Sequence, residues 1–148
     1  MKILLAASQN HHEATNTAAA AGSFPWPEGS EIRVLTVGEV ISTASLGLVP
    51  PVLDMPEIQA KIDDAAIDTA TAVAAELRRR GYRAAGVTKE GDPTTAIADY
   101  ARQWGADLIV VGSDDRSHLE RLMEPSVSEG VVKQASCSVP VVKQNNME

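Results

Sequence analysis

The sequence has few aromatic residues, one cysteine and no long hydrophobic run. Phe, Trp and Tyr make up only 3% of the chain, so its core must be built from Ala, Val, Ile and Leu. Cys137 has no second cysteine to pair with, which excludes an intrachain disulfide and is typical of a reducing compartment. No apolar run approaches the roughly 20 residues that span a bilayer, so we expect no contact with a membrane.

Clustered positive charge is also scarce. The formal net charge is −7, and no run of basic residues is longer than Arg78-Arg79-Arg80. Nucleic acid and anionic lipid attract basic surfaces, so neither is an expected partner. A predicted strand begins at Ile3, so we expect no signal peptide. We therefore expect a cytoplasmic protein.

What is present fits one domain over residues 1–148. A hydrophobic content of 44% is enough for a sizeable core at this length. Short apolar runs predict strands, and apolar residues at helical spacing predict helices between them. The expected strands cover residues 3–7, 32–37, 83–88, 108–111 and 139–143. The expected helices cover residues 12–21, 57–80, 93–104 and 126–135.

Several helix ends are marked by residues with a clear physical role. Gly22 and Gly81 are expected to end the first two helices, because glycine readily takes the left-handed conformation found there. Asp92 is the expected N-cap of the third helix, with Pro93 at its first position. Gly105 is expected to close that helix.

Strands that alternate with helices predict a three-layer α/β fold. The connections are too long for hairpins, so the sheet is expected to be parallel and open, with helices on both faces. Ligands of such sheets bind beyond the carboxyl ends of the strands, where the strand order switches. Those ends are predicted at Ala7-Ser8, Val37-Gly38, residues 89–91 and Gly112-Ser113.

Four blocks of sequence resemble the universal stress protein family, in order and over the whole chain. They are KILLAAS (residues 2–8), EGDPTTAIADYARQWGADLIVVGS (90–113), SVSEGVVKQASC (126–137) and SVPVVK (138–143). The resemblance implies a Rossmann-like, adenine nucleotide alpha hydrolase-like fold of five parallel strands in the order 3-2-1-4-5.

The resemblance also implies a homodimer in which the fifth strand pairs with the fifth strand of a second copy. Pro140 lies inside that predicted strand and is expected to interrupt the pairing on one side. The candidate interface residues are Val139, Pro140, Val141 and Val142.

The ATP-binding branch of this family has a cradle of Gly, two residues, Gly, nine residues, and Gly followed by Ser or Thr. On this sequence the resemblance makes Gly112 the first glycine and Ser126 the hydroxyl residue, whereas Asp115 and Pro125 replace the other two glycines. The acidic residue usual at the end of the first strand is Ser8 here. The candidate nucleotide-binding residues are Ala7, Ser8, Val37, Val111, Gly112, Ser113, Ser126, Val127 and Ser128.

Both replacements weaken a phosphate cradle. Glycine lets backbone N–H groups approach a phosphate, whereas proline has no N–H to offer. Aspartate adds negative charge, and two unit charges 4 Å apart repel by roughly 4 kcal/mol at an effective dielectric constant of 20. We therefore expect weak or absent ATP binding and no cofactor. A Mg²⁺ ion that bridged Asp114 or Asp115 to phosphate would turn the repulsion into attraction. ATP with Mg²⁺ is therefore kept as the alternative cofactor.

The sequence shows no recognisable catalytic set. The three histidines, at positions 11, 12 and 118, have no nucleophile-elbow Ser or Cys nearby, and no Gly-Lys-Ser or Gly-Lys-Thr phosphate loop occurs. We also expect no metal site. The leading hypothesis is a non-enzymatic stress-response homodimer that acts by binding an unknown protein partner. The alternatives are a nucleotide-binding switch and a small nucleotide hydrolase, which would need an uncharged or metal-bound Asp115.

Other notable residues have structural interpretations. Trp104 has the spacing of a core residue, and Cys137 is expected to be a small buried hydrophobe. Ser126 and Glu129 form a capping box that needs no ligand. The apolar segment Ser45 to Met55 is expected to cover the top of the sheet or to pack against a second subunit.

Overall fold

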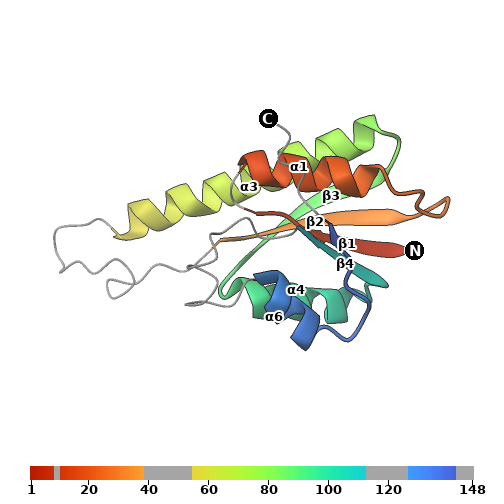
Figure 1. Cartoon of the computed structure of the whole chain (residues 1–148). Helices are drawn as coiled ribbons and strands as arrows, with labels where there is room; N and C mark the ends of the chain where they lie inside the picture. Colours follow the sequence, from red (N-terminus) through yellow and green to blue (C-terminus); the bar gives the residue numbers. More distant parts are fainter. Residues whose placement is uncertain (9–10, 39–54, 113–126, 143–148) are drawn as a thin grey trace.

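The computed structural model describes residues 1–8, 11–38, 55–112 and 127–142, and these form one parallel sheet with helices on both faces (Figure 1). In chain order the elements are β1 (Lys2–Ala6), α1 (His11–Gly22), β2 (Glu31–Gly38), α3 (Met55–Arg79), β3 (Arg83–Glu90), α4 (Pro93–Trp104), β4 (Leu108–Gly112), α6 (Val127–Gln134) and β5 (Val141–Val142). The strand order is β3-β2-β1-β4-β5, and every pair is parallel. The predicted three-layer fold and its strand order are confirmed.

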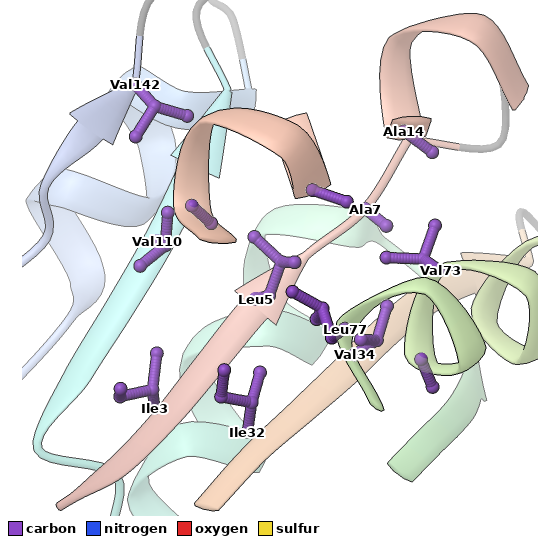
Figure 2. Packing of buried hydrophobic residues seen from close by; sticks show 13 residues of the cluster. Ile3, Leu5, Ala7, Ala14, Ile32, Val34, Val73, Leu77, Val110 and Val142 are labelled. Atoms are coloured by element: carbon purple, nitrogen blue, oxygen red, sulfur yellow. The ribbon is translucent and has the colours of Figure 1, made fainter. Parts of the chain in front are cut away.

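The core consists of two layers, one on each face of the sheet. Helices α1 and α3 cover one face, and α4 and α6 cover the other (Figure 1). Figure 2 shows the first layer, in which Leu5, Ile32 and Val110 of the strands lie on the same side of the sheet as Val73 and Leu77 of α3. The second layer is packed around Leu4, Leu35, Ile97, Ile109 and Val131. The small side chains of both layers agree with the scarcity of aromatic residues.

Strand β1 lies at the centre of the sheet, with a neighbour on each side. Successive residues of a strand point to opposite faces. Leu4 and Leu5 are nonetheless both fully buried, because helices cover both faces. This burial explains why β1 is a continuous apolar run rather than an alternating one.

The fully buried apolar residues of helix α3 lie in its C-terminal part. They run from Ala66 to Leu77, whereas Ala65, which the spacing predicts to be buried, is exposed. The N-terminal part of α3 extends beyond the carboxyl ends of the strands, where no sheet lies beneath it (Figure 1). The packed part comes very close to β3, because a Cβ at Gly86 would lie 2.9 Å from the carbonyl oxygen of Ala70. Gly86 therefore permits this contact between helix and strand.

The expected ends of α3 and α4 are confirmed, and α1 ends at Gly22, within one residue of the expected end. The Asp92 carboxylate accepts a hydrogen bond from the Thr95 backbone N–H at 3.0 Å, and Gly105 has a φ of 79°. Gly81, just after α3, has a φ of 95°. Gly22 is instead the last residue within α1 and does not have a positive φ. A Cβ there would lie 3.0 Å from Cδ of Arg80, so packing against that side chain favours glycine.

Strand β5 is shorter than predicted and begins after Pro140. The carbonyl oxygens of Ser138 and Pro140 accept hydrogen bonds from β4, at 3.0 and 3.2 Å. The N–H and C=O groups of an extended residue point to the same side, so the donor that Pro140 lacks belongs to the ladder with β4. The missing donor therefore lies on the β4 side, whereas pairing of β5 with a twin strand stays a prediction. The effect of Pro140 is to shorten β5.

Most of the apolar segment Ser45 to Met55 lies outside the described residues, and only Met55, at the start of α3, belongs to them. Among the helices of the described part, none combines the length and the apolar character needed to cross a membrane.

Candidate functional site at the carboxyl edge of the sheet

The strand register brings the predicted site residues of β1 and β4 to one edge of the sheet. Ala6 pairs with Val111, and the Ala7 N–H donates to the Leu35 carbonyl at 2.9 Å, so β1 stays bonded to β2 beyond its last residue. The chain order reverses here, because β1 lies between β2 and β4. This is the switch point at which sheets of this kind bind ligands.

The described floor of this edge is apolar. Ala7, Val37 and Val111 are at most 9% exposed and belong to the two core layers. Ser8 follows them and is half-buried. A hydroxyl group therefore stands where the family resemblance implies a carboxylate, so Ser8 cannot act as a charged acceptor for a nucleotide.

Two further predicted site residues lie in the first turn of α6. Val127 is 41% exposed and Ser128 is half-buried. Helix α6 lies so close to α4 that a Cβ at Gly130 would be only 2.7 Å from Cγ2 of Thr94. Glycine at this position therefore permits the contact between the two helices. The role of Gly130 was not predicted, since a glycine inside a helix gives no indication of which neighbour approaches it.

Four predicted positions lie outside the described residues: Ser113, Asp115, Pro125 and Ser126. The predicted capping box of Ser126 with Glu129 therefore stays a prediction, and His118 also lies outside the described residues. The effect of Asp115 and Pro125 on a phosphate therefore stays a prediction from the sequence.

The structure also reveals a hollow that the sequence did not predict. It has a volume of about 380 Å³ and lies between α3 and the ends of β2 and β3. Its lining residues are Gly38, Asp63, Ala66, Ile67, Thr88, Lys89 and Glu90. It opens at the same edge of the sheet as the predicted site, but toward the β3 side.

Two carboxyl groups meet in this hollow. A hydrogen bond to Asp63 and the negative charge of Asp63 raise the pKa of Glu90 above its ordinary value, with a smaller contribution from burial. Asp63 also accepts a hydrogen bond from Gln59 Nε2 at 3.1 Å. A Cβ at Gly38 would lie 3.0 Å from Asp63 Oδ1, so glycine leaves room for this carboxylate. Periodicity alone could not have shown that these residues of α3 and β3 meet.

The structural interpretations of Trp104 and Cys137 agree with their positions. Both are half-buried and pack against the second core layer. Burial raises the pKa of the Cys137 thiol, and the charge of Asp107 adds to this effect. Within the described ranges, no three His, Cys, Asp or Glu residues are grouped so that they could hold a metal ion.

A doubly wound parallel sheet with its switch point between β1 and β4 defines the structural class, and comparison with known proteins gives the family. Residues 1–143 match the universal stress protein family. Universal stress protein YxiE of Bacillus subtilis is 30% identical over 118 residues, which cover 77% of this chain and 80% of that protein. The chain therefore belongs to the universal stress protein family.

One further relative matches over a shorter length, and two solved structures match nearly the whole chain. Universal stress protein MJ0531 of Methanocaldococcus jannaschii is 44% identical over 59 residues, which are 40% of this chain and 35% of that protein. The solved structure of MJ0577 is similar over 99% of this chain and 97% of its own, with a TM-score of 0.76 and 24% identity. A universal stress protein solved in complex with cAMP has a TM-score of 0.74 and 17% identity over 98% of both chains. These two structural similarities concern the fold.

Proposed function

We propose that this chain is a non-enzymatic stress-response module that acts as a homodimer by binding a protein partner and binds ATP weakly or not at all. The observation that carries the proposal is the replacement of two cradle glycines by Asp115 and Pro125. One replacement adds negative charge and the other removes an N–H group.

The described edge of the sheet supports weak binding. Its floor, formed by Ala7, Val37 and Val111, is aliphatic and tightly packed, and the residue after β1 is Ser8 rather than an acid. Aliphatic residues can pack against a base but cannot bind phosphate by charge. A nucleotide bound here would therefore depend on the cradle segment, which carries the two replacements.

A second candidate function is a nucleotide-binding switch. It is favoured by relatives of the same fold, since one was solved with cAMP and another, from Archaeoglobus fulgidus, with dAMP (TM-score 0.63, 20% identity). Both ligands carry a single phosphate. A monophosphate brings less negative charge toward Asp115 than ATP does, so AMP and cAMP belong in the same test.

Thermal unfolding with and without Mg-ATP distinguishes these functions. A ligand present at 100 times its Kd adds about 2.7 kcal/mol to the free energy of unfolding, whereas one present at or below its Kd adds at most about 0.4 kcal/mol. We expect no resolved shift with about 1 mM Mg-ATP. A shift of several degrees would favour the switch, and phosphate release in the same tube would instead show a hydrolase.

A further inference from the structure

Strand β3 is the edge strand of the sheet, and no described strand covers its outer side. It pairs with β2 and with no other described strand. The Gly91 N–H donates to the Gly38 carbonyl at 3.1 Å, so the odd-numbered residues of β3 direct their backbone groups toward β2. The N–H and C=O groups of residues 84, 86, 88 and 90 therefore point away from the sheet.

One of these outward groups is already covered. Arg78 of α3 donates a hydrogen bond from Nη1 to the Ala84 carbonyl at 2.7 Å. This guanidinium blocks the amino-terminal end of the edge. From Gly86 to Glu90 the edge still presents backbone donors and acceptors to a further strand.

The side of β3 that faces α4 is only partly covered and carries positive charge. Arg83, Ala85 and Lys89 are exposed, and Val87 is half-buried. Arg33 of the neighbouring strand β2 lies beside Ala85. Tyr100 of α4 borders the same surface, since its hydroxyl accepts a hydrogen bond from Arg33. We call this surface the β3 shelf; it consists of Arg33, Arg83, Ala85, Val87, Lys89 and Tyr100.

Aromatic residues of α4 contact two of the three cations of the β3 shelf, Arg33 and Lys89. Arg33 Nη1 donates to the Tyr100 hydroxyl at 2.8 Å, and its guanidinium carbon lies 4.4 Å from the Trp104 ring centre. Lys89 Nζ lies 5.8 Å from the Tyr100 ring centre. Such cation–π contacts restrict flexible side chains while leaving their charge available to a partner.

The charge of the β3 shelf is opposite to that of the whole chain. Among the described acidic residues, Glu31 lies 3.8 Å from Arg33 and pairs in register with Arg83, and Glu90 follows Lys89 in the strand. The whole chain has a formal net charge of −7. A second β3 would bring its own Arg83 and Lys89 to the same strip, so the charge disfavours pairing of two β3 edges and favours an anionic segment.

We propose that β3 binds an extended acidic segment of a partner protein, which adds as a sixth strand beside residues 86–90. Main-chain hydrogen bonds to the open edge would supply affinity. Carboxylates on alternate residues of the segment would meet Arg83 and Lys89, because they lie on the α4 side of the sheet. The inference rests on the proposed partner-binding function and names the surface and the chemistry of the partner.

The test uses the full-length chain and a fluorescein-labelled peptide of sequence Glu-Val-Glu-Thr-Glu-Val-Glu, with a matched peptide in which Lys replaces each Glu. We expect the acidic peptide to bind and the basic one not to bind. Reversal of charge in Arg83→Glu/Lys89→Glu should weaken binding at least about tenfold. Lys133→Glu, an exposed reversal on α6, should leave binding unchanged.

A backbone measurement separates strand addition from general charge attraction. Amide resonances of Gly86, Thr88 and Glu90 should shift on binding and become protected from exchange. The inference is overturned by absence of binding at about 1 mM acidic peptide, by equal binding of both peptides, or by shifts confined to other elements. Tighter binding of a single-stranded oligonucleotide, or self-association that the double reversal abolishes, would overturn it as well. None of these outcomes depends on Mg-ATP, so the proposed weak binding of ATP is tested separately.

Discussion

Thr36 of β2 carries a hydroxyl group on the side of the sheet that forms the first core layer. Its side chain is fully buried, and its oxygen has no hydrogen-bond partner among the described residues. A buried polar group without a partner loses its hydration and gains nothing in return. At the scale of single residues, this is the least satisfied buried position in the described part of the chain.

We expect Thr36→Val to raise the free energy of unfolding by about 1 kcal/mol, because valine has the same shape and needs no partner. Urea denaturation measures this change. Ser30→Ala is the matched control: the Ser30 hydroxyl donates to the Pro27 carbonyl at 2.6 Å, so its loss should lower stability by about 1 kcal/mol. Destabilisation by Thr36→Val as large as that of Ser30→Ala would show that the Thr36 hydroxyl has a partner.

At the scale of elements, the carboxyl pair of Asp63 and Glu90 links the N-terminal part of α3 to the end of β3. The hydrogen bond and the charge of Asp63 raise the pKa of Glu90, so the folded state binds the Glu90 proton more tightly than the unfolded state. The resulting stabilisation is fully present below about pH 4.5, the ordinary value for Glu90, and is lost as pH rises through the raised pKa.

Glu90→Gln should therefore remove this dependence on pH. The amide resembles the protonated carboxyl group and can keep the hydrogen bond to Asp63 at neutral pH. We expect the Tm of the variant to exceed that of the original chain by a margin that grows from pH 4 to pH 7. Glu28→Gln, an exposed change far from the pair, should show a constant margin. A constant margin for Glu90→Gln as well would contradict the raised pKa of Glu90 in the folded state.

The elements were predicted well where local chemistry determines them, and less well where neighbours do. Apolar runs predicted β1 and β4, and Asp92 and Gly105 predicted the ends of α4, because these features depend on adjacent residues. Gly22 ends α1 as expected but does not take the left-handed conformation, and its closeness to Arg80, which is distant in sequence, follows from no local pattern. For the same reason, no local pattern revealed the Asp63–Glu90 pair or the cations of the β3 shelf.

At the scale of the whole molecule, the outer edge of β5 is the surface on which the proposed homodimer depends. Of the four candidate residues, Val141 is 50% exposed, whereas Val142 is 5% exposed and packs in the first core layer. Pro140 uses its carbonyl for β4, so it does not remove a donor from the outer edge. Val141 is thus the most informative position for mutation.

We expect light scattering to give the mass of two chains for the original protein and of one chain for Val141→Asp, because burying a charge between two strands without a partner is costly. Val132→Asp changes an equally exposed valine, 51% exposed on α6, and should leave the dimer intact. A mass of one chain for the original protein, or a dimer that survives Val141→Asp, would contradict this interface.

Asp115 and Pro125 are proposed to prevent the cradle segment from binding phosphate. The most direct measurement is a calorimetric titration of Mg-ATP into the original chain, into Asp115→Gly/Pro125→Gly, and into Asp114→Gly as a control for loss of charge alone. We predict no measurable binding for the original chain and the control, and an affinity at least about tenfold higher for the double variant. Tight binding of Mg-ATP to the original chain, with no gain in the double variant, would show that Asp115 and Pro125 do not weaken phosphate binding.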